Sequence, residues 1–157
     1  ARGQRSEPMA VGEICNREVV LIGARESVSA AAHLMRDHHV GDLVVVREEA
    51  QGRVPAGIIT DRDLVVELLG EDVEPEKVTV GDILDHELWT AKEDEDILEV
   101  LERMREKGVR RMPVVDGDGA LVGILTLDDL LDLFAEQLDK MVQLIGREQR
   151  REKTTRR

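Results

Sequence analysis

The chain has very few aromatic residues. They make up only 1% of its 157 residues, with one Trp, one Phe and no Tyr. Proteins that bind single-stranded nucleic acid by stacking its bases on aromatic side chains need more of them, so that class is disfavoured. Hydrophobic residues still form 41% of the chain. The core must therefore be aliphatic, which is typical of sheets flanked by helices.

Positive charge, cysteine and long apolar runs are also scarce. The net charge is −12, so non-specific attraction to nucleic acid or to an anionic membrane is not expected. One cysteine, Cys15, cannot form an intramolecular disulfide, which is typical of a cytoplasmic protein. No apolar run approaches the length of about 18 residues that indicates a membrane span. Ala1–Pro8 lacks the apolar stretch of a signal peptide, and we expect a disordered leader there.

What the chain does contain is an internal repeat. Val11–Ile14 matches Val80–Ile83 at an offset of 69 residues, and Gly57–Leu64 matches Gly123–Leu130 at an offset of 66. The offset changes inside a loop rich in Gly, Glu and Asp, where insertions are tolerated. Only two copies occur, so we expect a pseudo-symmetric pair and not a solenoid.

Each copy is predicted to be an α/β (α+β) unit with the order strand, helix, strand, strand, helix. One helix in each copy has apolar residues at steps of three and four, after the N-cap residues Ser27 and Asp96. Loops are expected over Glu48–Pro55 and Asp116–Ala120. The predicted division is a leader at 1–10, a first unit at 11–70, a linker at 71–79, a second unit at 80–136, and a helix extension with a charged tail at 137–157.

The C-terminal segment departs from the repeat. Its apolar residues continue at steps of three or four, and Gly146 is a plausible end for the helix, with a frayed tail after it. The stripe can pack within the chain or form the seam of a homodimer, and we expect the homodimer. The stripe consists of Leu131, Phe134, Leu138, Met141 and Ile145.

Both copies contain the signature Gly-φ-φ-Thr-x-x-Asp-Leu, where φ is aliphatic. It places Thr60 with Asp63, and Thr126 with Asp129, where a strand ends and a helix begins. Such a helix N-terminus is suited to anions, an ionised Asp can accept two hydrogen bonds from a ribose diol, and the glycine allows a ligand to approach the backbone. The alternative is that Thr-x-x-Asp is a capping box that only stabilises the helix.

The ordered set of motifs resembles the CBS domain, named after cystathionine β-synthase. The resemblance depends on Val-Gly-x-Ile, the helices ending in Met-Arg, the stretch Val109–Asp116 and both Thr-Asp signatures, and it covers about Val11–Phe134. It implies a tandem pair, or Bateman module, with two clefts that bind AMP, ADP or ATP, and less often S-adenosylmethionine or NAD. It also implies a disc-like dimer and a regulatory role.

The resemblance also implies roles for individual residues. The signature Asp63 and Asp129 would hold ribose hydroxyls, with Thr60 and Thr126 beside the ribose and phosphate. The adenine would lie against residues of the opposite copy, which are Ala10, Cys15 and Val40 for the Asp129 cleft, and Thr79, Leu84 and Val109 for the Asp63 cleft.

In the family, a basic residue two positions before the proline of the middle strand contacts phosphate. Here that residue is Arg111, with Arg110 beside it, whereas the first copy has Asp42 at the matching position. We therefore expect an adenine nucleotide to bind best at Thr126, Asp129 and Arg111, because a carboxylate repels phosphate. The alternative for the two arginines is a solvated pair of strand-edge charges.

Other candidate sites are weaker. His33, His38 and His39 lie near one helix end, have no counterparts in the second copy, and are interpreted as surface residues, so no metal site is predicted. Cys15 is interpreted as a small buried residue. No catalytic motif is found, so an enzyme is not expected. The alternative to a nucleotide sensor is a structural interaction module with degenerate clefts.

Overall fold

The computed structural model describes residues 9–84 and 87–155. The chain divides into two compact units, one that ends at Leu125 and one that begins at Thr126. The first unit contains the whole first repeat and residues 80–125 of the second, and the second unit is dominated by one long helix.

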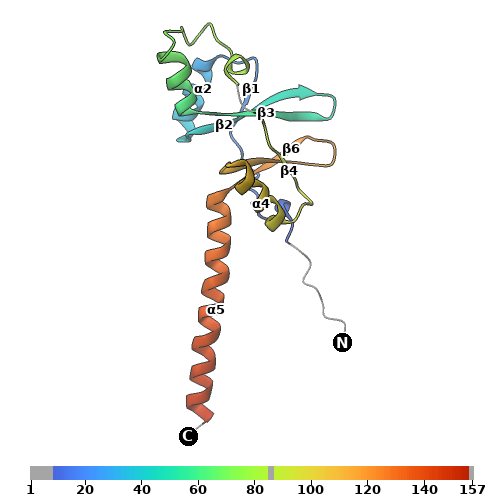
Figure 1. The fold of residues 1–157 in the computed structure, drawn as a ribbon, viewed down its shortest axis with the longest axis vertical. Coiled ribbons are helices and arrows are strands. Elements are labelled where there is room, and N and C mark those ends of the chain that lie inside the picture. The colour runs from blue at the N-terminus through green and yellow to red at the C-terminus, as the bar shows by residue number, and fades with distance from the viewer. Residues whose placement is uncertain (1–8, 85–86, 156–157) are drawn as a thin grey trace. The chain divides into compact units, whose positions relative to one another are not determined.

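The first repeat contains a three-stranded sheet with the order β1-β2-β3 (Figure 1). Strand β1 is parallel to β2, and β2 is antiparallel to β3. Its elements are α1 (Val11–Ile14), β1 (Leu21–Gly23), α2 (Val28–His38), β2 (Asp42–Glu49), β3 (Gly52–Thr60), α3 (Asp61–Leu64) and the wider helical turn η1 (Val65–Leu69).

The second repeat forms the sheet β4-β5-β6, in which β4 is parallel to β5. The predicted order of strand, helix, strand, strand and helix is therefore confirmed in both copies. The elements are the short 3₁₀ turn η2 (Val80–Ile83), β4 (Ala91–Lys92), α4 (Ile97–Lys107), β5 (Arg111–Val115), β6 (Leu121–Thr126) and α5 (Leu127–Thr155).

Helices α2 and α4 begin and end in matching ways. Ser27 and Asp96 cap their first turns by accepting hydrogen bonds from backbone N–H groups, as the sequence predicts. Each helix ends on a left-handed residue, His39 with φ 54° and Gly108 with φ 66°. These two residues are 69 positions apart, so the repeat extends to the backbone conformation of the helix ends.

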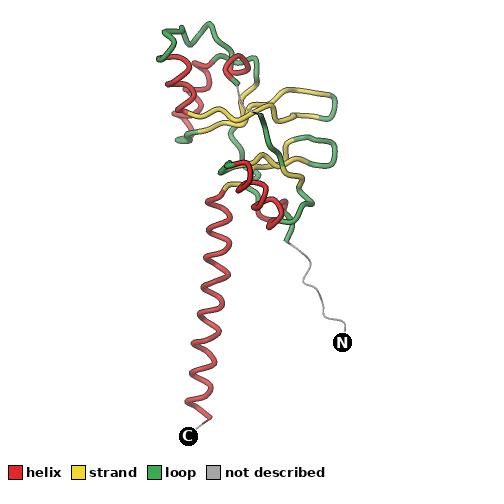
Figure 2. The backbone as a smooth tube through the Cα atoms, in the orientation of Figure 1, coloured by secondary structure: helices red, strands yellow, loops and turns green. Residues whose placement is uncertain are grey.

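The prediction of a loop over Glu48–Pro55 is wrong. Strand β2 continues to Glu49 and β3 begins at Gly52, so most of this segment is a hairpin with a tight turn (Figure 2). Gly52 has φ 118°, which a glycine adopts without strain. Pro55 fits in the strand because the register shifts between Val45 and Val46, as at a β-bulge. The repeat offset falls from 69 to 66 because the first copy has three more residues here than the second. These three residues lengthen the strands and not the loop.

The opening segment of each repeat is hydrogen-bonded to the other repeat. The N–H of Val80 donates to the carbonyl of Glu26 at 2.8 Å, and the N–H of Val11 donates to the carbonyl of Glu95 at 2.9 Å. These two bonds are equivalent under the 69-residue offset. Val80 and Val11 are both 0% exposed, and Val80 belongs to the hydrophobic core of the first repeat. This reciprocal exchange joins the two repeats.

The glycines of the Val-Gly-x-Ile motif are required by that exchange. A Cβ at Gly81 would lie 2.9 Å from the carbonyl oxygen of Ala24, and a Cβ at Gly12 would lie 3.0 Å from that of Glu93. The hydrogen-bonded structure already begins at Met9, whose carbonyl accepts from a backbone N–H of α4 at 3.0 Å. Met9 therefore already takes part in backbone hydrogen bonding, and residues 1–8 of the predicted leader lie outside the described residues.

The expected helix end at Gly146 is also wrong. Helix α5 continues to Thr155, for 29 residues in all, and Figure 2 shows it as one continuous helix. A glycine inside a helix lowers helix stability by about 1 kcal/mol relative to alanine. Side-chain contacts near Gly146 help the long helix to continue through it. Lys140 pairs with Glu136 at 2.9 Å, and Arg150 donates to the carbonyl of Gly146 at 3.3 Å.

Candidate functional site

One cavity of about 370 Å³ lies within the first unit. We call it the Asp63 pocket. The first repeat contributes Gly57, Ile58, Thr60 and Asp63, and the second repeat contributes Glu87, Leu88, Trp89, Arg110, Leu84, Val109 and Arg111. The pocket thus brings together six of the residues predicted from the sequence, which are Thr60, Asp63, Leu84, Val109, Arg110 and Arg111.

Thr60 and Asp63 form a capping box at the start of α3. The Asp63 N–H donates to Thr60 Oγ1 at 3.2 Å, and the Thr60 N–H donates to Asp63 Oδ2 at 2.9 Å. Thr126 and Asp129 form the same pair of bonds at the start of α5, at 3.1 and 3.3 Å. Both signatures therefore form capping boxes. The box at α3 occupies one carboxylate oxygen of Asp63, and a carboxylate has a second oxygen with which to accept a hydrogen bond.

Thr79 has the same capping role but lies outside the pocket lining. Its side chain accepts from the N–H of Asp82 at 3.3 Å at the start of η2. Hydrogen bonding by the Thr79 side chain and backbone lowers the pKa of Asp82. The structure thus gives Thr79 a capping role and does not place it in the lining of the Asp63 pocket.

The signature glycines make room for the opposite repeat. A Cβ at Gly57 would lie 2.8 Å from Leu84 Cδ2, and a Cβ at Gly123 would lie 2.8 Å from Cys15 Sγ and 2.7 Å from the Asn16 carbonyl oxygen. We predicted that these glycines allow a ligand to approach. The structure shows that they allow a residue of the other repeat to approach, and at Gly57 that residue is itself part of the pocket wall.

Arg111 is held in the pocket by an ion pair across the repeats. Its Nε lies 2.7 Å from Asp42 Oδ2, with the side chains 38% and 28% exposed respectively. Asp42 is the first residue of β2 and Arg111 is the first residue of β5. These two positions match between the repeats, and the sequence predicts that Arg111 attracts a phosphate and that Asp42 repels it. The structure pairs them, so Asp42 orients the guanidinium.

The placement of Arg111 corrects the sequence-based assignment of clefts. We expected Arg111 to serve the cleft of Asp129, whereas it lines the pocket of Asp63 together with Val109. Val109 and Arg111 are two residues apart where β5 begins, so the same short segment supplies both to one wall. Arg111 therefore contributes its positive charge to the Asp63 pocket.

The remaining predicted residues belong to different units. Ala10 precedes α1 and forms a β-bridge with the residue that caps α4, Cys15 is half-buried, and Val40 donates its N–H to a carbonyl near the end of α2 at 3.0 Å. Thr126 and Asp129 lie in the second unit. A cleft formed by all five stays a prediction.

Sequence reasoning missed Trp89, which also lines the Asp63 pocket. The Nζ of Lys107 lies 4.1 Å from the centroid of its ring, a cation–π contact. Trp89 is the only Trp in the chain, and it follows Leu84 within the same opening segment. A lone Trp in an almost purely aliphatic chain was the signal that could have identified it.

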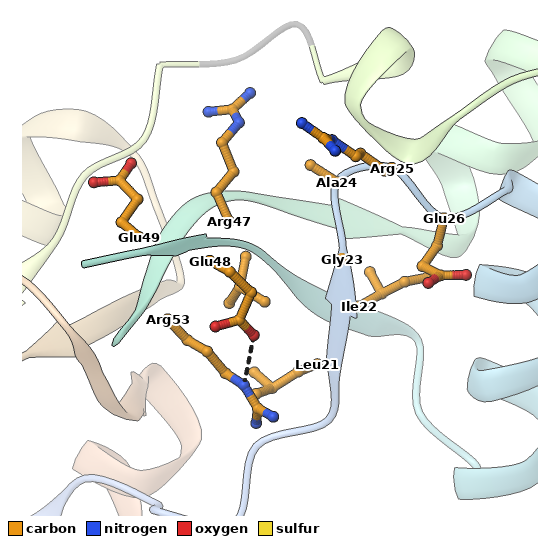
Figure 3. Close-up of a pocket in the computed structure, with 11 residues that line it drawn as sticks. Leu21, Ile22, Gly23, Ala24, Arg25, Glu26, Arg47, Glu48, Glu49 and Arg53 are labelled. Atoms are coloured by element: carbon orange, nitrogen blue, oxygen red, sulfur yellow. Dashed lines mark hydrogen bonds and ion pairs between the residues drawn. The ribbon is translucent and has the colours of Figure 1, made fainter. Parts of the chain in front are cut away.

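A larger cavity of about 720 Å³ borders β1 and the β2–β3 hairpin (Figure 3). Its charged lining residues are three arginines and three glutamates, so their charges cancel. Arg53 pairs with Glu48 at 3.1 Å, and Figure 3 shows Arg25 and Arg47 directed away from that pair. The charged residues are Arg25, Arg47, Arg53, Glu26, Glu48 and Glu49, and all are exposed.

The histidines predicted to be surface residues are exposed. His33 and His38 lie on α2, and His39 ends it. Among residues 9–84 and 87–155, no group of three or more His, Cys, Asp or Glu side chains could hold a metal ion. In the same part of the chain, no helix is long and apolar enough to cross a membrane.

Comparison with known proteins gives a consistent result. Over 125 residues the chain is 37% identical to an uncharacterized protein of Methanopyrus kandleri, and the match covers 80% of this chain and 62% of that protein. The chain thus spans less than two thirds of that relative. The structure of Hypoxic Response Protein I with two coordinated zinc ions matches with a TM-score of 0.69 and 31% identity, over 79% of this chain and 98% of that chain.

A CBS domain pair in complex with 5′-methylthioadenosine and S-adenosyl-L-methionine matches with a TM-score of 0.68 and 28% identity, over 83% of this chain and 98% of that chain. The CBS domain family itself matches residues 11–70 and 80–136, which are the two repeats. The chain therefore belongs to the CBS domain family and carries two CBS domains in tandem.

Proposed function

We propose that the Asp63 pocket binds an adenine nucleotide, and that the protein is a regulatory nucleotide sensor and not an enzyme. The observation that carries this proposal is the meeting of Asp63, Arg111 and Trp89 in one cavity. A hydrogen-bond acceptor, a cation and an apolar surface are what a ribose, a phosphate and a purine base require. The volume of about 370 Å³ is within the usual range for small-molecule sites, roughly 300–1,000 Å³.

The ribose and the base have separate places in this arrangement. The capping box uses Asp63 Oδ2, which leaves Oδ1 to accept a hydrogen bond from a ribose hydroxyl. Leu84, Val109 and Trp89 supply apolar surface from the second repeat. An adenine ring placed against them would bury its faces while its edge nitrogens remain available for hydrogen bonds.

The phosphate is assigned to Arg111, with Arg110 beside it. The ion pair with Asp42 uses the Nε of Arg111, and a guanidinium has two further NH₂ groups that can hold a phosphate through charge-assisted hydrogen bonds. These cations favour AMP, ADP or ATP over S-adenosylmethionine, which has no phosphate. NAD remains an alternative because it combines adenosine with a pyrophosphate.

Binding would couple the two repeats. The ribose site belongs to the first repeat, whereas the base and phosphate sites belong to the second. A nucleotide in the pocket would favour the arrangement of the repeats in which all three sites contact it. Such a ligand shifts the conformational population only if its affinity differs between arrangements. A regulated partner could respond to that shift, and we place this activity in the cytoplasm because of the single cysteine.

A second candidate is a structural interaction module whose pockets bind no nucleotide. It is favoured by the capping boxes, because they give the signature Thr and Asp residues a structural role without any ligand. The Asp42–Arg111 ion pair likewise gives Arg111 a structural role. In either case we propose a homodimer, because the apolar stripe of α5 is exposed and exposed patches of this kind indicate interaction surfaces.

Calorimetric titration with AMP, ADP, ATP, NAD and S-adenosylmethionine tests the proposal. We expect the adenine nucleotides to bind, and Arg111→Ala to weaken their binding roughly ten- to a hundredfold, because a charge-assisted hydrogen bond contributes about 1.5–3 kcal/mol. Arg36→Ala, at an exposed arginine of α2 outside the pocket, is the matched control. If no adenine ligand binds the wild-type protein, the structural module is the correct interpretation.

A further inference from the structure

We propose that helix α5 pairs with α5 of a second copy of this chain, and that the two helices run antiparallel. This inference deepens the proposed homodimer and rests on it. It assigns the surface through which two copies associate and the relative direction of their chains.

The first observation is an exposed apolar seam along α5. Its residues follow one another at alternating steps of four and three, which is the heptad spacing of a coiled coil. They are largely exposed although they are apolar, so they require a partner. The seam residues and their exposed fractions are Leu131 56%, Phe134 37%, Leu138 62%, Met141 61% and Ile145 56%.

The dimensions of the helix suit a two-helix contact. With 29 residues, α5 is about 43 Å long at a rise of 1.5 Å per residue. Val142 and Leu144 are 66% and 67% exposed and widen the seam on both sides. Isolated helices gain little stability from propensity alone, so burial of this seam is the expected source of their stability.

The second observation is a separation of charge along α5, which selects the partner and the direction. Residues 127–139 contain five acidic residues and no basic ones, whereas residues 140–155 contain five basic and two acidic ones. A parallel pair would place each half beside a half of the same sign. An antiparallel pair places the acidic half of one helix beside the basic half of the other, so a second copy complements this helix in both seam and charge.

The antiparallel arrangement also fixes which residues meet. Leu138 lies midway between Leu131 and Ile145, so two seams that overlap fully place Leu138 beside Leu138 of the other copy. Leu131 of one copy then lies beside Ile145 of the other. The two Leu131 residues are about 21 Å apart along the axis, because fourteen residues at 1.5 Å each separate the matched positions.

Disulfide cross-linking of the full chain tests this arrangement. In a Cys15→Ala background, we would prepare Leu131→Cys, Leu138→Cys and Ile145→Cys and oxidise each one. A disulfide requires Cα atoms about 4.4–6.8 Å apart. We therefore expect Leu138→Cys to cross-link with itself. Leu131→Cys and Ile145→Cys should cross-link only with each other, when co-expressed, with the heterodimer identified by its mass.

The other outcomes are equally informative. Efficient self-cross-linking of all three variants would show a parallel pair and overturn the inference. A dimer in sedimentation that cross-links at none of the three positions would leave the homodimer in place but overturn the pairing through α5. A monomer at micromolar concentration for the unmodified protein would overturn both.

A charge substitution gives an independent measurement by sedimentation. Leu138→Glu places a carboxylate in the seam and should weaken dimerisation at least tenfold. Gln143→Glu introduces the same side chain on the opposite side of the helix and is the matched control. Dimerisation of the wild-type protein should weaken as salt rises, because the proposed pair is held partly by opposite charges. Strengthening with salt, or equal effects of the two variants, would contradict the proposal.

Discussion

The two CBS domains differ where their middle strands begin. Asp42 opens β2 and Arg111 opens β5, at positions 69 residues apart, and the two side chains meet at 2.7 Å. Identical residues at these positions would bring like charges together. Because the two copies differ at this position, they place opposite charges where the domains meet, and the charges form an ion pair. Only one of them, the arginine, lines the Asp63 pocket.

The domains also stabilise their opening loops differently. In the second domain, Arg103 forms two hydrogen bonds with Glu95, at 3.0 and 2.7 Å, and the carbonyl of Glu95 accepts from the opening segment of the first domain. The matching residue of the first domain is Leu34, which packs on the hydrophobic core. The same backbone exchange is thus supported by an ion pair on one side and by apolar packing on the other.

The largest expected effect distinguishes the two signature aspartates. Asp63→Ala should weaken AMP binding roughly ten- to a hundredfold, because it removes a hydrogen-bonded charge of about 1.5–3 kcal/mol. Asp129→Ala removes the same cap from α5 but is not part of the pocket lining, so it should change AMP affinity less. Calorimetry on both variants provides the measurement. An equal loss of AMP affinity in the two variants would contradict the proposed difference between the Asp63 and Asp129 sites.

A steric substitution tests the reciprocal exchange itself. Gly81→Ala should lower the free energy of unfolding by about 1–3 kcal/mol, because its Cβ would lie 2.9 Å from the Ala24 carbonyl oxygen. Gly117→Ala is the control, since no atom lies within 4 Å of a Cβ there. Urea denaturation compares them. A loss at Gly117 as large as that at Gly81 would mean that close packing is not the cause.

The ion pair of the second domain should make its stability depend on pH. Hydrogen bonding to Arg103 lowers the pKa of Glu95 in the folded protein. The stabilisation is therefore present above the pKa of the unfolded chain, and it is lost as the pH falls through the folded pKa. Because the pair is partly exposed, we expect Glu95→Gln to cost about 1 kcal/mol at pH 7.

That difference between Glu95→Gln and wild type should shrink as the pH falls below about 4.5, near which an ordinary glutamate is about half protonated. Urea denaturation at a series of pH values measures it. Glu26→Gln, at the matching position of the first domain, where Leu34 stands in place of Arg103, is the control substitution. A constant difference for Glu95→Gln at every pH would contradict the role of the ion pair.

The smallest expected effect concerns the residue that pairs with Arg111. Asp42→Asn removes a carboxylate next to the proposed phosphate site and should strengthen AMP binding by about threefold, as expected for a partly screened charge. Asp37→Asn, on the exposed side of α2, is the control in the same calorimetric assay. Weaker binding by Asp42→Asn would show that the orientation of Arg111 outweighs repulsion.

The fold was predictable because it depends on local patterns that occur twice. Helix faces, N-caps and short β-branched runs all specify their elements without long-range information. The hairpin was misjudged because Gly52 and Pro55 usually interrupt strands, and the β-bulge that accommodates Pro55 is not visible in the sequence. The helix end was misjudged because Gly146 is a strong local signal that the rest of a 29-residue helix overrides.

The site was predictable only in part. The signature located Thr60 and Asp63, since the strand-to-helix turn is local. Which signature aspartate shares a pocket with Arg111 depends on how the two repeats are joined, and this tertiary feature places Arg111 in the lining of the Asp63 pocket. Trp89 was missed because it lies in a segment without regular secondary structure, where no periodic pattern indicates which way a side chain points.

Intrinsic fluorescence tests the central proposal most directly, because the only Trp of the chain lines the Asp63 pocket. Titration of the wild-type protein with AMP should quench or shift Trp89 emission, and the change should saturate with the dissociation constant found by calorimetry. Arg111→Ala should move both curves to higher AMP concentration by the same factor. Calorimetric binding of AMP with no change in Trp89 emission would place the nucleotide elsewhere and contradict the account.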